Sequence, residues 1–260
     1  MIATEKAAEA LLNEHETRQH FHSIRTDYPF DDLGTAYAIQ DHVVSRLRKK
    51  NHAGIAGYKI GLTSLRMQEM CGIPHPIAGH VLQNRVHQSG YAVSVSDFVH
   101  IGIECEIAVR IGRDLTDSGP ISADALASAI SGVAPAFELV EDRHADYKSL
   151  DMLTLVADNS WNAGIVLGEF QSAWPDLAAI EGVLTFDGHE IDHGFGRDVM
   201  GHPLEPLAWL CRHLWSRGEM LHAGDILMTG SMTPTRFPSA GQHYKFSLSG
   251  LGTVETIFKA

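Results

Sequence analysis

Two glutamates separated by one residue stand in a segment with the pattern of a β-strand. Over residues 103–109, apolar residues alternate with other residues at a period of two, as in a strand with one buried face. Glu104 and Glu106 then point to the same face, where two carboxylates repel each other unless a positive charge lies between them. Mg²⁺ and Mn²⁺ prefer such oxygen ligands. The spacing indicates either a divalent-metal site or the solvent-exposed acidic face of an edge strand.

A third glutamate, Glu138, lies in an otherwise apolar segment at residues 134–140. A carboxylate in a buried strand is costly unless it is paired or bound to a metal. Together with Glu104 and Glu106 it could supply three oxygen ligands and leave positions on Mg²⁺ for water or substrate. The alternative for Glu138 is a salt bridge at the end of a strand.

A single lysine, Lys59, lies between two glycines in another segment that reads as a strand. Gly57, Lys59 and Gly61 share one face of it, and positions without side chains let a ligand approach the backbone closely. The opposite face is apolar, which argues against the alternative of a surface lysine on a strand kinked by glycines.

Two polar turns follow apolar stretches and could contribute to a site. One contains Asp158 and Ser160, and the other contains Thr229, Gly230 and Ser231. Ordinary turn chemistry explains either of them when it is considered alone.

Composition excludes several classes of protein. The net charge of −12 over 260 residues argues against nucleic acid and anionic membrane surfaces as partners. Three cysteines without C-x-x-C spacing suggest neither a zinc knuckle nor a disulfide framework, and they fit a reducing cytoplasm. We expect no signal peptide, because the N-terminal segment carries Glu5, Glu9 and Glu14 within an amphipathic pattern. We expect no membrane span, because no apolar run approaches ~20 residues. A zinc site at His189 and His193 is disfavoured because the D-G pair before them predicts a hairpin.

The order of the elements predicts an α+β fold. The first fifty residues are predicted to be helical, with a second helix after Gly34. Two later helices are predicted, one capped by Ser122 and one with Pro206 near its first turn. The irregular order argues against a Rossmann sheet and a TIM barrel. Nine strands are predicted, at 55–63, 91–95, 103–111, 133–140, 163–168, 183–186, 226–229, 244–248 and 253–258.

Taken together, these residues resemble the fumarylacetoacetate hydrolase superfamily, in its branch of 2-keto-4-pentenoate hydratases and 4-oxalocrotonate decarboxylases. The resemblance covers nearly the whole chain, and the ordered set of motifs is more specific than any one of them. The motifs are G-Y-K-I-G-L-T-S at 57–64, E-C-E at 104–106, P-A-F-E at 135–138, V-A-D-N at 156–159, G-H-P-L at 201–204 and G-D-I-L-M-T-G at 224–230.

The resemblance implies a mostly β, mixed-sheet, fumarylacetoacetase-like α+β fold. It implies an N-terminal helical region at 1–53 and a catalytic β-rich region at 54–260, and we expect the two regions to form one continuous domain. It implies a cytoplasmic homo-oligomer that acts on a small 2-oxo acid. It also implies a site with three kinds of residue. Metal ligands to Mg²⁺ or Mn²⁺ are Glu104, Glu106 and Glu138; catalytic residues are Lys59, Asp158 and Ser160; substrate-binding residues are Gly61, Trp161, Thr229, Gly230 and Ser231.

Two positions depart from the hydratase pattern. Ile77 stands where hydratases of this branch carry an aspartate that assists the addition of water, and decarboxylases tend to carry isoleucine. Trp161 replaces a small hydroxyl residue and should reshape the pocket. His75 or His80 could substitute for the missing acid.

Four functions therefore stay open. A metal-dependent lyase of the hydratase type is placed first, ahead of a decarboxylase. A C–C bond hydrolase of the acylpyruvase kind would need a Glu-His pair such as Glu141 and His144. A catalytically silent 2-oxo-acid binding protein is the fourth.

Overall fold

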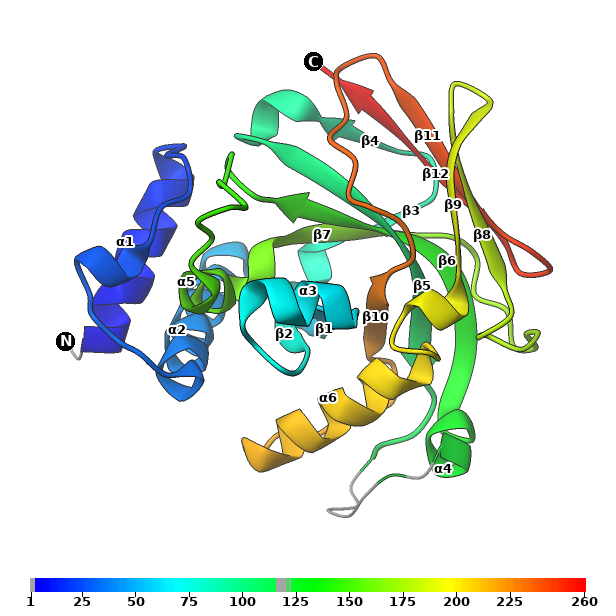
Figure 1. Cartoon of the computed structure of the whole chain (residues 1–260), viewed down its shortest axis with the longest axis horizontal. Helices are drawn as coiled ribbons and strands as arrows, with labels where there is room; N and C mark the ends of the chain where they lie inside the picture. Colours follow the sequence, from blue (N-terminus) through cyan, green and yellow to red (C-terminus); the bar gives the residue numbers. More distant parts are fainter. Residues whose placement is uncertain (1–2, 116–120, 122) are drawn as a thin grey trace.

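The protein is described by a computed structural model that places residues 3–115, 121 and 123–260 (Figure 1). The helical N-terminal region is present, and its second helix begins at Leu33, where the side chain of Asp32 caps it by accepting from the Thr35 N–H. Ser122, predicted to cap a helix, lies outside the described residues. The α-helices are α1 (Ala3–Glu16), α2 (Leu33–Asn51), α3 (Leu65–Cys71), α4 (Ala123–Ala127), α5 (Met152–Ala157) and α6 (Leu204–Ser216).

All nine predicted strands are present, and three more join them. The D-G pair forms the predicted hairpin, with Asp187 and Gly188 both at positive φ between β8 and β9. The strands are β1 (Ile55–Gly61), β2 (Ile77–Leu82), β3 (Val86–Gln88), β4 (Tyr91–Ser94), β5 (Ile101–Ile111), β6 (Ile130–Glu141), β7 (Asn162–Leu167), β8 (Glu181–Phe186), β9 (His189–Phe195), β10 (Ile226–Ser231), β11 (His243–Leu248) and β12 (Gly252–Lys259).

A seven-stranded mixed sheet, in the order β2-β1-β10-β5-β6-β7-β3, carries the residues predicted to do chemistry. β2 also contacts β7, although four strands lie between them in the sheet order, so the sheet curls on itself. The inner face of this curl bears Lys59, Glu104 and Glu138. Six buried aliphatic side chains form a separate cluster on the same face, and they are Val81, Ala108, Ala136, Ile165, Leu167 and Met228.

A five-stranded sheet, in the order β4-β12-β11-β8-β9, packs against the outside of the curl (Figure 1). Phe137, on the outer face of β6, meets Phe246 of β11 with 6.2 Å between ring centroids. The alternation along β6 thus sends Phe137 into the core between the sheets and Glu138 to the inner face.

The N-terminal helices cover another part of the curled sheet. α2 contacts α1, α5 and β2, and the buried Ala7 and Leu11 of α1 belong to the same apolar core as Phe137. The apolar core is therefore shared by residues on both sides of position 53. The predicted division of the chain into regions 1–53 and 54–260 stays a prediction. Among the described residues, no helix combines the length and the apolar character needed to cross a membrane.

Candidate active site

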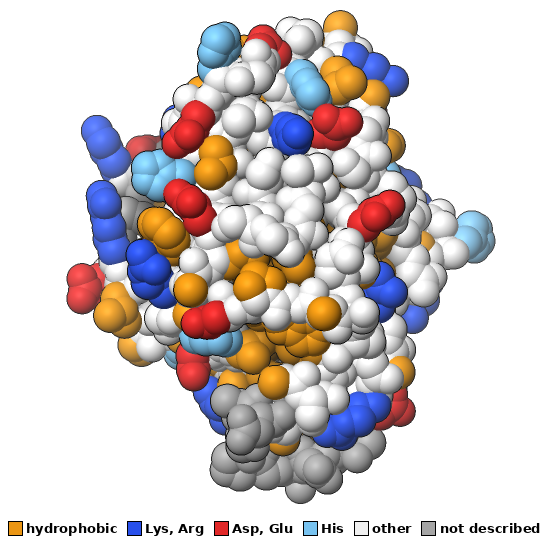
Figure 2. Space-filling model, turned by 90° about the vertical axis from the view of Figure 1, so that its right-hand side faces the viewer, with side chains coloured by type: hydrophobic (Ala, Val, Ile, Leu, Met, Phe, Trp, Pro, Cys, Tyr) orange, Lys and Arg blue, Asp and Glu red, His pale blue; other side chains and the backbone are white. Residues whose placement is uncertain are grey.

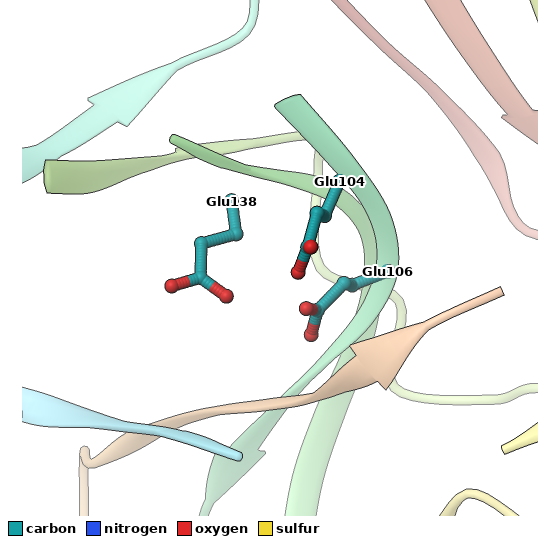
Figure 3. Close-up of side chains that lie close together, drawn as sticks. All are labelled: Glu104, Glu106 and Glu138. Atoms are coloured by element: carbon teal, nitrogen blue, oxygen red, sulfur yellow. The ribbon is translucent and has the colours of Figure 1, made fainter. Parts of the chain in front are cut away.

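Three glutamates from two neighbouring strands come together on the inner face. Glu104 and Glu106 project from β5, and Glu104 pairs in register with Glu138 of β6. One oxygen of each carboxylate lies within 4.8 Å of the others, and Figure 3 shows the three groups pointing toward one another. In the described part of the chain, this is the one group of three or more acidic, His or Cys side chains with such geometry. The strand alternation predicted the arrangement, and the alternative of an exposed acidic edge is wrong because Glu106 and Glu138 are fully buried.

Each carboxylate is fixed by one hydrogen-bond donor. The hydroxyl of Thr235 donates to Glu104 Oε1 over 2.6 Å, and the Gly230 N–H donates to Glu106 Oε2 over 2.7 Å. The Asn162 amide donates to Glu138 Oε1 over 2.9 Å.

The remaining oxygens of the two buried glutamates are available for a ligand. Glu106 Oε1 is buried and has no hydrogen-bond partner, and Glu138 Oε2 is buried and forms an ion pair with Lys59 Nζ, at 3.4 Å. Burial raises the pKa of Glu106 far above its ordinary range, and the neighbouring Glu138 and Glu104 raise it further. Burial also raises the pKa of Glu138 to about 7, although Lys59 opposes this shift. Buried oxygens that repel one another and lack donors fit a hard divalent cation, which would satisfy all of them at once.

Lys59 is buried beside the three glutamates. It is 5% exposed, which rules out a surface lysine, and its Nζ lies 3.4 Å from Glu138 Oε2. Burial alone would lower the pKa of Lys59, but Glu138, Glu104 and Glu106 together keep it above the ordinary value. The ammonium group is therefore retained as a positive charge inside the curl.

Small side chains around Lys59 leave space next to its ammonium group. A Cβ atom on Gly61 would lie 3.3 Å from both Lys59 Nζ and Ile77 Cγ1, since Gly61 pairs in register with Ile77. Gly79 pairs with Lys59, and a Cβ atom there would lie 2.6 Å from the Asn159 carbonyl oxygen. Ile77 thus forms an apolar wall beside the position predicted to bind substrate.

Gly230 has a structural reason for its residue type. Its φ of 107° is in the region that favours glycine, and a Cβ atom there would lie 2.1 Å from Thr63 Oγ1. Only glycine lets this backbone N–H reach Glu106.

Four other predicted site residues use their side chains elsewhere in the fold. Ser160 Oγ donates to the carbonyl of Ala78, and Thr229 Oγ1 donates to the carbonyl of Ile107. Ser231 Oγ donates to the carbonyl of Thr233 over 2.6 Å. The structure does not bring these hydroxyls to Lys59, and their roles in chemistry stay predictions.

Asp158 is the fourth, and it belongs to a buried ion network. Its carboxylate contacts Arg143 Nη2 at 2.8 Å and His15 Nε2 at 2.6 Å, and Arg143 also binds Glu14 of α1. Although burial opposes it, His15 and Arg143 lower the pKa of Asp158. The network ties α1 to the turn at 158–161, where Asn159, Ser160 and Trp161 all have positive φ.

Trp161 packs between aromatic rings. Its indole is 6% exposed and makes edge contacts with Phe21 and Tyr147 at centroid distances of 5.1 and 6.0 Å. It lines a cavity of about 410 Å³ together with Asn162, which binds Glu138, but Lys59 and the three glutamates do not line this cavity. Its predicted contact with substrate stays a prediction.

Sequence reasoning missed Asn162 and Thr235, which hold two of the glutamates. Neither lies in a motif with fixed spacing to the glutamate that it binds. Thr235 is 131 residues from Glu104 along the chain, so only the folded sheet brings the two together.

Comparison with known proteins places this geometry in a known family. Residues 66–259 match the family model described as fumarylacetoacetate (FAA) hydrolase C-terminal. The match spans more than half of the chain, and the chain therefore belongs to the fumarylacetoacetate hydrolase family.

Individual relatives indicate the branch of the family to which the chain is similar. A 2-keto-4-pentenoate hydratase of Burkholderia vietnamiensis is 33% identical over 237 residues, covering 90% of this chain and 89% of that protein. A 4-oxalocrotonate decarboxylase of Pseudomonas putida is 31% identical, covering 96% and 95%. The structure of 4-oxalocrotonate decarboxylase from Pseudomonas putida G7, complexed with magnesium and adipate, is 28% identical with a TM-score of 0.91, covering 98% and 97%. The fumarylacetoacetase-like fold and the branch that the motifs predicted are confirmed.

Proposed function

We propose that the protein is a divalent-metal-dependent lyase of the hydratase type, acting on a small 2-oxo acid or its 2-hydroxydienoate form. The observation that carries this proposal is the buried group of Glu104, Glu106 and Glu138 with Lys59 Nζ 3.4 Å from one carboxylate. Its buried carboxylate oxygens, two of which accept no hydrogen bond, fit Mg²⁺ or Mn²⁺ held by these three side chains. The hydratase relatives, which match over most of the chain, support the type of reaction.

In this reaction the residues of the chain would hold the metal ion, orient the substrate and neutralise its negative charge. When bound, the cation would act as a Lewis acid on the 2-oxo and carboxylate oxygens of the substrate. The Lys59 ammonium supplies a second positive charge, and it can move a proton to or from the substrate carbon chain. The aliphatic cluster on the inner face keeps water from the far side of these charges, which strengthens their effect. Asn162, Thr235 and Gly230 hold the carboxylates in place.

Decarboxylation is the second candidate, and Ile77 is the observation that favours it. Its side chain lies next to Gly61, in register with it, where an acid could otherwise activate water. The similar decarboxylase structure supports the same alternative. His80, considered as a substitute base, has Nδ1 3.2 Å from Gln40 Oε1 and packs against Tyr58 on the opposite face of β1.

Product analysis by NMR separates the two reactions. The protein with Mg²⁺ is incubated with 2-hydroxypenta-2,4-dienoate and, separately, with 4-oxalocrotonate. The proposal expects a 4-hydroxy-2-oxo acid from the first substrate. Release of CO₂ from the second, with no hydration of the first, would reverse the order of the two candidates. Metal binding without turnover of any 2-oxo acid would favour the silent binding protein.

C–C bond hydrolysis has less support. Glu141 accepts hydrogen bonds from the backbone N–H groups of Val99 and His100, and His144 stacks on the ring of His100. These contacts occupy the two side chains that were considered as a water-positioning pair.

We also propose a cytoplasmic homo-oligomer. Figure 2 shows hydrophobic side chains gathered below the centre of one face, with charged side chains around them. Contiguous apolar surface of this kind is typical of protein interfaces. The three cysteines are free, as expected in a reducing compartment.

Metal affinity is expected to rise with pH across the neutral range. Because burial raises the pKa values of Glu106 and Glu138, both carry protons in the metal-free protein at low pH, and metal binding must release them. We expect weaker Mn²⁺ binding at about pH 6 than at about pH 8, with proton release on binding. Calorimetry in two buffers of different ionisation enthalpy measures both quantities. Equal affinity at the two pH values with no proton release would contradict the assignment of these carboxylates.

Trp161→Ser is expected to admit longer 2-oxo acids. Removing the indole joins its volume to the cavity that it lines next to Asn162. The measurement is kcat/KM for substrates of increasing chain length, with Phe21→Leu as a control on the other side of the indole. A uniform loss for all lengths, with a stability loss of about 3–5 kcal/mol, would show that Trp161 is only a core residue.

A further inference from the structure

The cavity of about 410 Å³ that Trp161 lines lies between the outer face of the curled sheet and the N-terminal helices. His80 and Leu82 of β2 and Leu139 of β6 line it from the sheet, and residues of α1 and α2 line it from the other side. Successive residues of a strand point to opposite faces, so Leu139 points away from the face that bears Glu138. The cavity is therefore separate from the glutamate site, and its volume lies in the range of small-ligand pockets, about 300–1,000 Å³.

A buried hydrogen-bond donor at this cavity has no partner. The Nε1–H group of Trp161 is buried and forms no hydrogen bond with any described residue. An indole N–H that is removed from water normally finds an acceptor, because leaving it unpaired costs free energy. A ligand that brings an oxygen atom into the cavity would supply this acceptor.

An arginine approaches the turn that carries Trp161 from the side of α1. Arg18 follows α1 and lies in the chain between two residues that contact this turn. His15 binds Asp158 at 2.6 Å, and the ring of Phe21 lies 5.1 Å from that of Trp161. Arg18 lines the cavity, its side chain is exposed, and it forms no ion pair with any described residue.

A second arginine approaches the same turn from the side of β3. Arg85 directly precedes β3, which pairs with β7, and its carbonyl oxygen would lie 2.8 Å from a Cβ atom on Gly164, three residues after Trp161. Arg85 also lines the cavity, is exposed and has no ion-pair partner in the described chain. Burial lowers the pKa of the neighbouring His87 and Arg85 lowers it further, so His87 is neutral at pH 7 and the positive charge on this side is that of Arg85.

The carboxylates at the cavity do not neutralise the two arginines. Asp158 is already bound by Arg143 and His15, and Glu141 accepts one backbone N–H on each of its oxygens. Asp97 also lines the cavity, but it is exposed and pairs with no cation among the described residues. Apart from these polar groups, the helices contribute apolar side chains, which are Leu12, Val43 and Leu47.

We propose that this cavity binds a small carboxylic acid with an apolar body, at a site separate from the three glutamates. The carboxylate accepts the indole N–H of Trp161, and Arg18 and Arg85 balance its charge. Hydrogen bonds between guanidinium and carboxylate groups are among the strongest in proteins, and these two guanidinium groups have no competing anion. The apolar body of the ligand packs against the side chains of α1 and α2, as in pockets that combine a mostly apolar lining with a few polar groups.

Three small probes test the proposal by calorimetry and by the change in indole fluorescence. Hexanoate has the charge and the apolar body, hexanamide keeps the body and an acceptor oxygen without the charge, and acetate keeps the charge without the body. We expect hexanoate to bind about tenfold or more tightly than either of the others, as a charge-assisted hydrogen bond and the burial of a carbon chain allow. Hexanoate has no 2-oxo group with which to chelate a metal, so its Kd should be the same in the metal-free and the Mn²⁺-loaded protein.

Variants of the lining residues assign the binding to this cavity. Arg18→Gln and Arg85→Gln should each weaken hexanoate binding severalfold, to about tenfold, and leave the Kd of hexanamide unchanged. Trp161→Phe, which keeps a ring but removes the N–H group, should weaken both ligands, because both present an oxygen to it. Arg212→Gln is the matched control, since Arg212 is an exposed arginine of α6 that does not line the cavity, and it should change neither Kd.

Several results would overturn this site. Binding of hexanoate only in the presence of Mn²⁺ would place it at the glutamates instead. Equal Kd values for hexanoate and hexanamide in the parent, or an unchanged Kd of hexanoate in both arginine variants, would remove the carboxylate site. Absence of hexanoate binding in both forms of the protein would do the same, while the metal-dependent lyase function is decided separately by turnover.

Discussion

Glu106→Gln is expected to lower Mn²⁺ affinity by on the order of 10²-fold or more, and to remove most activity while the fold is kept. Loss of a residue that only orients a metal ligand costs about 10–100-fold, and loss of the ligand itself should cost at least as much. The amide keeps an oxygen that can accept from the Gly230 N–H, so the local backbone is retained. Glu104→Gln and Glu138→Gln are expected to act in the same direction.

Glu106→Gln should have opposite effects on the stability of the metal-free protein and on the stability gained by binding metal. Burial and repulsion from neighbouring glutamates raise the pKa of Glu106 in the folded protein. At a pH above the ordinary pKa of a glutamate, this raised pKa therefore destabilises the metal-free protein. The neutral amide of glutamine removes this cost. We expect Glu106→Gln to raise the Tm of the metal-free protein at neutral pH and to reduce the gain in Tm on adding Mn²⁺.

Calorimetry and thermal melts with and without Mn²⁺ make this measurement. Glu190→Gln is a suitable control, because Glu190 is exposed in the β8–β9 hairpin, away from the site. If Glu106→Gln binds Mn²⁺ as tightly as the parent, the metal site is misassigned.

The strands that the sequence predicted are those with a visible period of two. β5 and β6 carry long alternating or apolar runs, and both were predicted nearly in full. β2 was missed because all six of its residues are buried, so its two faces do not differ in polarity. β9 was missed for the opposite reason, since it is mostly exposed and is defined by pairing with β8.

The site was predictable where one residue broke a local pattern. Two glutamates on one strand face, a glutamate in an apolar run and a lysine between glycines are such breaks. Asn162 and Thr235 break no pattern, and only the pairing of distant strands reveals them. Asp158 and Ser160 look like site residues in the sequence, because the sequence does not show that Arg143 and a backbone carbonyl already bind their polar groups.

Lys59→Ala is expected to lower kcat/KM by on the order of 10²-fold or more, the scale of one lost proton-transfer or electrostatic group. The ammonium group lies 3.4 Å from Glu138 and faces a space kept open by Gly61. No other lysine or arginine of the described chain forms an ion pair with the three glutamates, so no neighbouring cation can replace it.

Two measurements separate a role on the substrate from a role on the metal. Removing Lys59 changes metal affinity in two opposing ways, because it takes away the cation that opposes the raised pKa of Glu138 and also a cation that repels the metal ion. The kinetics are therefore compared at saturating Mg²⁺, with Lys59→Arg as the variant that keeps the charge but changes its position. A loss that persists at saturating metal in both variants assigns Lys59 to proton transfer at a fixed position. Recovery in Lys59→Arg assigns it to charge alone, and unchanged kinetics in Lys59→Ala would exclude it from the reaction.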